Sequence, residues 1–340
     1  MMESKWVWFM RMMVMRTLLL LEGCRWCTTN ACLEQERIAL LHLKPFFNSH
    51  YNDLRSWDEV KNLDCCEWKG VECNTTSKRL IGLSFYSEEW FQGEKLKDRY
   101  LNASLFLPFV ELKRLYLSGN AIAGCVENEG FGKLSSTLNN LKILDLSYNY
   151  LNDSILLSLS ELSSLRYLDL SYNRIEGSSH SRGFQWISRL TKLETLALSG
   201  NSLKNSVLLH MRNLSSLKTL RLSDNQLEGR LLHTQGLNNL INLRKLDLRG
   251  NQIESFQSFK DGDRKLKLTH LEELYLDSNL FNDSVFASLN KLSNLKYLSI
   301  SGNQLKGSID MKDLDAFTNL RTLDMSNNEL KDIVIHKGII

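Results

Sequence analysis

The 340-residue chain has very little proline, with only Pro45 and Pro108. This scarcity excludes a proline-rich linker or a polyproline recognition segment. Net charge is also nearly absent, because 42 basic residues face 39 acidic ones and leave a formal charge of +3. Such a balance gives no whole-chain argument for binding nucleic acid or anionic lipid, and we expect no nucleic-acid partner.

Long apolar runs are missing as well. A membrane-spanning helix needs about 20 predominantly apolar residues, and no segment provides them. The N-terminus, MMESKWVWFMRMMVMRTLLLLEGCRWC, is basic and apolar, but Arg11 and Arg16 leave only Thr17–Leu21 as a short apolar core. This pattern favours an irregular secretory signal peptide over residues 1–31. A disordered tail or an error in the gene model is the alternative.

What the chain does contain is an internal repeat. The segment Leu165–Ile175, LRYLDLSYNRI, follows the pattern L-x-x-L-x-L-x-x-N-x-[LI], and nine copies occur in register. Their asparagines are 24 to 29 residues apart. These are Asn120, Asn149, Asn173, Asn201, Asn225, Asn251, Asn279, Asn303 and Asn328. The pattern is that of leucine-rich repeats, and it decides the architecture before any single residue is considered.

Alternating leucines, such as Leu168 and Leu170, indicate a short half-buried strand in each copy. The longer segment after each asparagine must turn back and bring the next strand alongside. We therefore predict an α/β fold, a leucine-rich-repeat solenoid (right-handed superhelix) with a parallel sheet on its concave face. The stretch SKRLIGLSF is expected to be a degenerate first copy, with Leu80, Leu83 and Phe85 pointing inward. Each repeated asparagine is expected to satisfy backbone groups where a strand ends.

Catalytic motifs are not recognisable. The sequence has no G-x-S-x-G, H-E-x-x-H, P-loop or kinase glycine-rich pattern. One repeat position does carry a carboxylate in four copies, Asp145, Asp169, Asp247 and Asp324. Regular recurrence indicates an exposed structural column instead of a catalytic pair. We predict neither an enzyme nor a cofactor.

Cysteines are concentrated ahead of the repeats. The seven are Cys24, Cys27, Cys32, Cys65, Cys66, Cys73 and Cys125. Disulfides would suit a secreted solenoid whose first coil must be sealed, although four cysteines allow three pairings. A metal site is disfavoured because the sequence lacks paired C-x2-C motifs and has no histidines close to these cysteines. A helix is expected over CLEQERIALLHLKPFF, with Leu33, Ile38, Leu40, Leu41 and Leu43 on its apolar face and Pro45 at its end.

The CLEQERIALLHLK helix, the W-x-x-x-x-x-x-D-C-C-x-W-x-G-V-x-C run from Trp57 to Cys73 and the repeats together resemble the plant leucine-rich-repeat receptor-like proteins. This resemblance implies a disulfide-bonded N-terminal cap with Cys32–Cys65 and Cys66–Cys73 pairs, and it leaves Cys125 over. We expect the cap over residues 32–76 and the repeats over 77–340. After each asparagine the copies read LNDSI, LKNSV or LKGSI, without the proline of the common plant pattern L-x-G-x-I-P, which indicates a diverged outer face.

The resemblance implies the ligand-binding extracellular region of a plant receptor-like protein in immune or developmental signalling. A peptide or protein ligand and a receptor-kinase co-receptor are the expected partners, and the secretory pathway and cell surface the expected location. A secreted inhibitor of cell-wall-degrading enzymes is the first alternative, although its repeats are more regular. Because no capping unit follows Asn328, the array is expected to be C-terminally incomplete, and a non-functional truncated product is the second alternative.

The concave face is the expected functional surface, because its outward side chains have no packing duties. Tyrosine and arginine often anchor interfaces. The candidate ligand contacts are Tyr116, Tyr148, Tyr167, Tyr172, Arg221, Arg249, Tyr275 and Tyr297. Five N-x-[ST] sequons are candidate glycosylation sites in a secreted chain. They begin at Asn74, Asn102, Asn152, Asn213 and Asn282.

Overall fold

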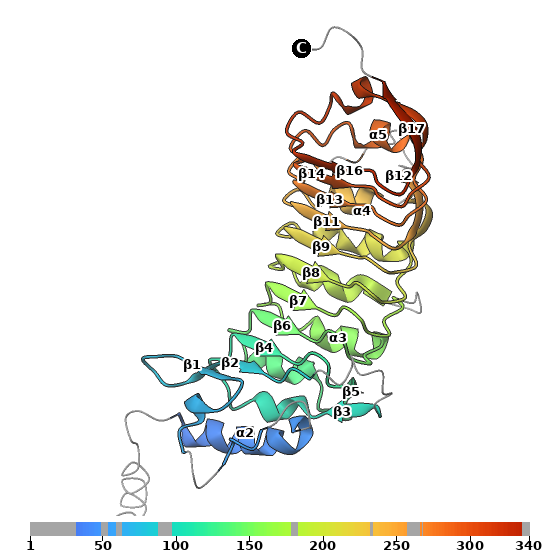
Figure 1. The fold of residues 1–340 in the computed structure, drawn as a ribbon. Coiled ribbons are helices and arrows are strands. Elements are labelled where there is room, and N and C mark those ends of the chain that lie inside the picture. The colour runs from blue at the N-terminus through green and yellow to red at the C-terminus, as the bar shows by residue number, and fades with distance from the viewer. Residues whose placement is uncertain are drawn as a thin grey trace, which may run out of the picture.

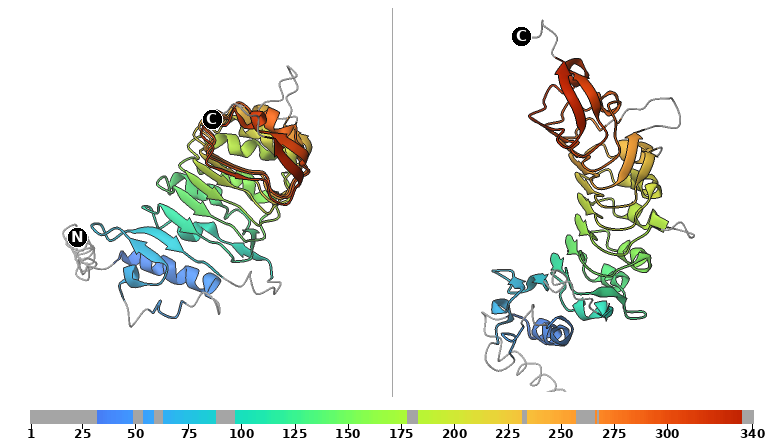
Figure 2. Two further views of the ribbon diagram at one scale, coloured as in Figure 1. Left: turned by 45° about the horizontal axis from the view of Figure 1, so that its top comes forward. Right: turned by 45° about the vertical axis from the view of Figure 1, so that its right-hand side comes forward.

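The computed structural model describes residues 32–48, 54–58, 63–87, 97–177, 183–231, 234–256, 266 and 268–334. They form a curved stack of coils that rises from helix α2 (Glu34–Phe47) to strand β17 (Glu329–Val334) (Figure 1). Strands line one side of the stack, and short helices and small sheets lie on the other (Figure 2). The expected signal peptide, with Cys24 and Cys27, lies outside the described residues.

One sheet of eleven strands runs along the concave side in the order β1-β2-β4-β6-β7-β8-β9-β11-β13-β14-β16. All neighbours are parallel except β1 and β2, which are antiparallel. The predicted parallel sheet is therefore confirmed. The bounds are β1 Val71–Cys73, β2 Leu80–Ser84, β4 Arg114–Tyr116, β6 Ile143–Asp145, β7 Tyr167–Asp169, β8 Thr195–Ala197, β9 Thr219–Arg221, β11 Lys245–Asp247, β13 Glu273–Tyr275, β14 Tyr297–Ser299 and β16 Thr322–Asp324.

The outer side of the stack is built from short helical segments. They are the 3-10 helices η3 Ala103–Phe106, η4 Phe131–Ser136, η5 Asp153–Ile155, η6 Gly183–Arg189, η7 Asn205–Asn213 and η8 Met311–Leu314, and the α-helices α3 Leu156–Leu159, α4 Thr234–Asn238 and α5 Val285–Leu289. Three parallel strand pairs accompany them. These are β3 (Arg99–Leu101) with β5 (Ile122–Cys125), β10 (Glu228–Leu231) with β12 (Gln252–Phe256), and β15 (Lys306–Asp310) with β17.

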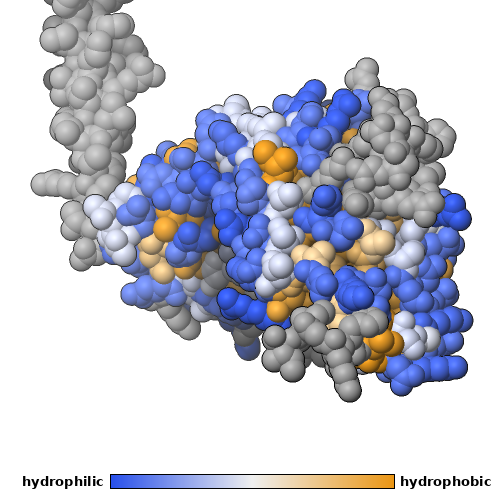
Figure 3. All heavy atoms as spheres, turned by 90° about the horizontal axis from the view of Figure 1, so that it is seen from above, coloured by the Kyte–Doolittle hydropathy of each residue, from blue (hydrophilic) through white to orange (hydrophobic). Residues whose placement is uncertain are grey.

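The core is a continuous column of leucines that runs the length of the stack. In interior coils the inward strand residues, such as Leu168 and Leu220, are fully buried. Leu80, Leu83 and Phe85 of the degenerate first copy are buried in the same column, as predicted. In the last described coil Leu323 and Met325 are only part buried. Figure 3 looks down on this end, where apolar residues appear among hydrophilic ones.

The repeated asparagines form a hydrogen-bonded ladder behind the strands. In one rung, Asn225 Nδ2 donates to the carbonyl oxygens of Leu198 (2.9 Å), Leu222 (3.2 Å) and Ser223 (3.0 Å). Its Oδ1 accepts from the backbone nitrogen of Leu203 at 3.0 Å. Leu198 and Leu203 belong to the preceding coil, so each rung joins two coils. The predicted structural role of the asparagines is confirmed.

The N-terminal cap covers the first coil. Helix α2 buries Ala39, Leu40, Leu43 and Phe47, and the Phe47 ring stacks on Phe85 of the first repeat with centroids 4.1 Å apart. Two details of the predicted helix were wrong. Leu33 and Ile38 are exposed, because the buried face is turned toward the first repeat instead. Pro45 lies inside the helix, which continues to Phe47.

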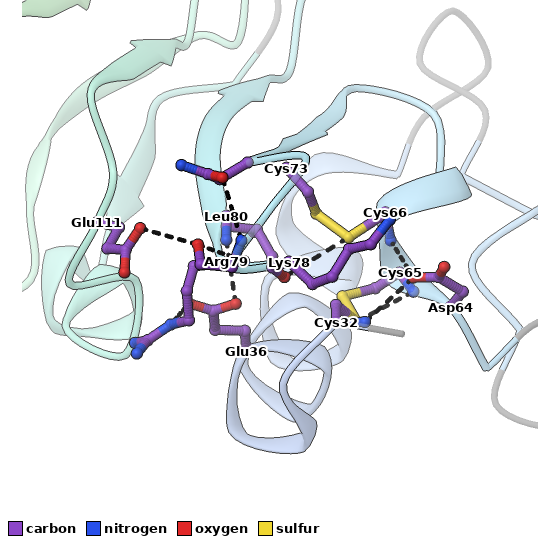
Figure 4. Close-up of a disulfide and its surroundings, with 12 residues drawn as sticks. Cys32, Glu36, Asp64, Cys65, Cys66, Cys73, Lys78, Arg79, Leu80 and Glu111 are labelled. Atoms are coloured by element: carbon purple, nitrogen blue, oxygen red, sulfur yellow. Dashed lines mark hydrogen bonds and ion pairs between the residues drawn. A yellow bond between two sulfur atoms is a disulfide. The ribbon is translucent and has the colours of Figure 1, made fainter. Parts of the chain in front are cut away.

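Two disulfides join the cap, Cys32–Cys65 and Cys66–Cys73, as the resemblance implies. Figure 4 shows them beside a second junction, in which Glu36 of α2 reaches the start of β2. The Glu36 carboxylate accepts from the backbone nitrogen of Leu80 at 3.1 Å and from Nε of Arg79 at 3.0 Å. The side chain is fully buried, and burial raises the pKa of Glu36 despite these donors.

Candidate ligand-binding face

The last residue of each parallel concave strand forms one column across the middle of the repeat pattern, which we call the centre column. Strand pairing places Tyr116 beside Asp145, Asp145 beside Asp169, and so on without a register shift. The full order is Ser84, Tyr116, Asp145, Asp169, Ala197, Arg221, Asp247, Tyr275, Ser299 and Asp324. The sequence alignment of the copies therefore gives the spatial order of these residues correctly.

The expectation of a uniformly exposed aspartate column is wrong. Asp247 is only 3% exposed, because the side chain of Arg249 folds back over it. Asp145 is also largely shielded, and burial raises the pKa of its carboxyl group, an effect to which the neighbouring charge of Asp169 adds. Ser147 opposes the shift by donating to Asp145 from both its backbone nitrogen and its hydroxyl.

Tyr148 and Tyr172 form a stacked pair at one end of the strands. Their ring centroids are 4.4 Å apart and the rings are within 11° of parallel. Both residues have left-handed backbone conformations, with φ of 52° and 54°. Residues other than glycine rarely adopt this backbone conformation, which costs about 1–2 kcal/mol per residue. The next coil has Gly200 at this position, where an added Cβ would lie 2.4 Å from the Tyr172 ring.

Tyr167 is the first residue of β7, in the same N-terminal half of the face, and makes different contacts. Its hydroxyl donates to Asp169 at 3.1 Å. Burial and the negative charge of Asp169 raise the pKa of Tyr167, so the phenol stays protonated. Tyr116 lies further toward the cap, two strands away from Tyr167. The N-terminal half of the face thus combines hydroxyl donors with partly shielded carboxylates.

A second cluster lies on β11, β13 and β14. Tyr275 and Tyr297 have ring centroids 4.9 Å apart, and the Lys245 ammonium group sits 4.6 Å from the Tyr275 centroid. The Arg249 guanidinium is 5.1 Å from that centroid and also pairs with Asp247. Cations over an aromatic face are favourable by about 0.5–1 kcal/mol at exposed sites. These contacts hold Tyr275 in one orientation.

Arg221 lies between the two clusters on β9. It is exposed, and within the described parts of the chain no carboxylate forms an ion pair with it. Its neighbour on one side is Ala197, which offers no polar group, and its neighbour on the other is Asp247, which Arg249 already neutralises. The guanidinium can therefore bind an external carboxylate without first losing an internal partner.

Two residues of the second cluster were missed by sequence reasoning. Lys245 and Glu273 occupy the outward position two residues before the centre column, and Lys245 Nζ donates to Glu273 at 2.6 Å and to the Tyr275 hydroxyl at 3.3 Å. Tyr86, at 44% exposure, was missed because the first copy is degenerate. Listing every outward position of each strand would have found Lys245 and Glu273, and extending the list to the residues after each strand would have found Tyr86.

Four of the five candidate glycosylation asparagines accept a hydrogen bond from the nearby backbone. The Oδ1 atoms of Asn74, Asn102, Asn152 and Asn282 accept from the backbone nitrogen two residues ahead. This leaves Nδ2, the atom that a glycan would modify, free of those bonds. Asn152, Asn213 and Asn282 are exposed, and Asn74 and Asn102 are half-buried.

Cys125 has no disulfide partner among the described cysteines, and burial raises its pKa to about 11. Across the described ranges, no cluster of three histidine, cysteine, aspartate or glutamate side chains could hold a metal ion. The helices in those ranges are too short or too polar to cross a bilayer.

Comparison with known proteins gives the family. The model "Leucine rich repeat N-terminal domain" matches residues 33–74, and "Leucine Rich repeats (2 copies)" matches residues 241–290 and 293–337. Cuscuta receptor 1 of Solanum lycopersicum is 31% identical over 290 residues, which are 84% of this chain and 21% of that protein. Receptor-like protein 13 of Arabidopsis thaliana is 32% identical over 300 residues, or 85% of this chain and 23% of that protein. The chain belongs to the leucine-rich-repeat family, and these relatives are plant receptor-like proteins.

Receptor-like proteins of this family are typically non-catalytic. The present chain spans about a fifth of the length of the relatives it matches. A plant ice-binding protein has a similar structure, with a TM-score of 0.62 and 27% identity over 88% of both chains. The ectodomain of the Arabidopsis receptor kinase HAESA, solved with an IDA peptide hormone, shares the fold with a TM-score of 0.53 and 23% identity, over 88% of this chain and 54% of that one.

Proposed function

We propose that this chain is the ligand-binding extracellular region of a plant receptor-like protein, and that its concave face recognises a peptide or protein ligand in immune or developmental signalling. The centre column carries the proposal. Leucines and asparagines supply the packing and the hydrogen bonds of every coil, whereas the outward residues differ from coil to coil. Variable side chains on a rigid scaffold suit specific recognition.

The proposed contacts have different tasks. Tyr148 and Tyr172 offer a preorganised aromatic surface, which lowers the entropy that a ligand must lose on binding. Arg221 is the proposed anchor for a ligand carboxylate, because it is exposed and none of the described carboxylates forms an ion pair with it. Tyr275 and Tyr297 form the opposite end of the same face, with Tyr116 and Tyr167 toward the cap.

The proposed partners follow by analogy of fold. Solved structures of the HAESA ectodomain contain the peptide hormone IDA, and one of them also contains the co-receptor SERK1. We propose a peptide or protein ligand and a receptor-kinase co-receptor for the present chain, and no enzymatic activity of its own. The two disulfides suit an oxidising compartment, so the proposed location is the secretory pathway and the extracellular side of the plasma membrane.

The test uses the secreted chain and peptides selected from a random-peptide display library. Peptides that bind the wild type are titrated against Arg221→Ala and Tyr275→Ala. Loss of such an anchor typically costs 1–3 kcal/mol, so affinity should fall roughly tenfold or more, while the unfolding midpoint changes little. Arg212→Ala is the matched control, since Arg212 is exposed at the end of η7 on the outer side. Peptides that lose affinity for Arg212→Ala but not for the concave variants would contradict the proposal.

A further inference from the structure

A row of basic residues lies beside the centre column, at the edge where the chain enters each strand. We call it the basic edge, and it is the second position of the nine leucine-rich copies. The row consists of Lys113, Lys142, Arg166, Glu194, Lys218, Arg244, Glu272, Lys296 and Arg321. Seven cations and two carboxylates leave five net positive charges, against +3 for the whole chain.

The residues of the basic edge are physical neighbours. Each backbone nitrogen in the row donates to the carbonyl oxygen of the preceding member, from Lys142 to Lys113 at one end through to Arg321 and Lys296 at the other. These bonds measure 2.8 or 2.9 Å throughout. Adjacent members therefore have the spacing of hydrogen-bonded strands, about 4.8 Å. Apart from the half-buried Lys113, all the cations are exposed.

The two carboxylates are covered by their basic neighbours. Glu194 pairs with both Arg166 and Lys218, and its side chain is 28% exposed while theirs are 56% and 54% exposed. Glu272 pairs in the same way with Arg244 and Lys296. Each trio keeps one net positive charge, and its cationic groups face the solvent. Hydrogen bonds from the paired cations lower the pKa of both glutamates, so the arrangement persists in mildly acidic solution.

A depression of about 380 Å³ lies in the middle of this edge. Four of its lining residues are the cations Arg166, Lys192, Lys218 and Arg244. The others are Glu194 and two uncharged polar residues, so neither an aliphatic nor an aromatic side chain lines it. Protein and peptide partners usually anchor through aromatic or apolar side chains in a pocket. This lining offers such anchors nothing, but it suits a ligand made of carboxylates and hydroxyls.

We propose that the basic edge is a second binding surface, separate from the centre column, which takes a linear acidic polysaccharide with one carboxylated sugar in the depression. In an extended peptide, side chains on one face recur every 6.6–6.8 Å or so, which does not match the strand spacing of about 4.8 Å. Every ring of an acidic polysaccharide carries a carboxylate and hydroxyls, which are the groups that a lining of cations and uncharged polar side chains can bind. The proposal does not depend on the ligand of the concave face.

The experiment measures binding of an α-1,4-linked oligogalacturonate to the whole secreted chain by calorimetry. The wild type should bind it, with an affinity that falls as salt is raised, because the contacts are charged and exposed. The fully methyl-esterified oligomer, which keeps the backbone and loses the charge, should not bind measurably. The double variant Lys192→Glu/Lys218→Glu should lose affinity by roughly tenfold at least, since two attractions become repulsions.

The matched control is Arg212→Glu/Lys312→Glu, which makes the same change of net charge at exposed outer positions. It should bind within about twofold of the wild type. Circular dichroism and the melting curve check that both double variants fold. The proposal is overturned if the esterified oligomer binds as well as the acid, or if the two double variants lose affinity equally. Tighter binding of poly-glutamate than of oligogalacturonate would assign the edge to an acidic peptide instead.

Discussion

Removing the Arg249 side chain should show whether this residue of the concave face stabilises the fold. Arg249 donates to Asp247 through Nε at 2.9 Å and Nη2 at 2.6 Å, and Asp247 is 3% exposed. Among the described residues, the backbone nitrogen of residue 249, 3.2 Å from Oδ1 in the wild type, is the one donor that the Asp247 carboxylate keeps in Arg249→Ala. It becomes a buried charge without a cation, which is the unfavourable half of a broken ion pair.

The magnitude lies between two limits. Breaking a fully buried pair costs about 3–5 kcal/mol, whereas an exposed pair contributes about 0–1 kcal/mol. Here one partner is buried and the other has 49% of its side chain exposed, so solvent screens part of the interaction. We expect Arg249→Ala to lower the free energy of unfolding by about 1–3 kcal/mol.

Urea denaturation followed by circular dichroism measures this change, provided that the wild type and the variant have the same slope. The double variant Asp247→Asn/Arg249→Ala should recover most of the loss, because asparagine can accept from the same backbone nitrogen without a charge. If Arg249→Ala is as stable as the wild type, or if the double variant is less stable than the single one, the reasoning is refuted. Any ligand-binding defect of Arg249→Ala must be interpreted against the double variant.

Three further predictions concern the glycine, the cap and the free thiol. Gly200→Ala should lower stability by about 1–2 kcal/mol in a thermal or urea melt, because a left-handed alanine is strained and its Cβ meets the Tyr172 ring; an unchanged midpoint would contradict this. Burial raises the pKa of Glu36, so the contribution of this carboxyl group to stability is present below about pH 4.5 and is lost as pH rises. Glu36→Gln should therefore gain stability relative to the wild type between about pH 4 and pH 7, and a stability difference that stays constant with pH would exclude this linkage. Iodoacetamide should label Cys125 far more slowly in the folded chain than in urea at pH 8, because with a pKa of about 11 roughly one thiol in a thousand is ionised; equal rates would show that the thiol is not shielded.

The stack itself could be predicted from the sequence because its determinants are periodic. Leu168 and Asn225 each have equivalents in every copy, and all of them perform one task in the same place. The cap disulfides came from the family resemblance, since the spacing of the cysteines left three pairings open. The domain boundaries, the ligand contacts and the glycosylation sites stay predictions.

The details that sequence reasoning missed depend on contacts between side chains of different copies or at irregular spacing. Asp247 is buried because the arginine two residues ahead folds back over it. The other aspartates of the column have no arginine at that position. Ile38 is exposed because the orientation of α2 is set by Phe47 packing on Phe85. Tyr148 and Tyr172 stack because a left-handed backbone directs both rings the same way. None of these follows from composition or period.

The asparagine ladder also bears on how such a gene can change its length. Each rung bonds to its own coil and to the coil before it, through the same backbone positions every time. A recombination event that duplicates or deletes one whole unit, cut at equivalent points, would therefore recreate every rung bond on both sides of the junction. A cut that separates an asparagine from its strand would leave an unbonded amide inside the stack, whereas a cut in the outer segment only changes the coil length, which already varies from 24 to 29 residues. The ladder thus tolerates gain or loss of whole coils, and a lineage can acquire a new recognition surface without a new fold.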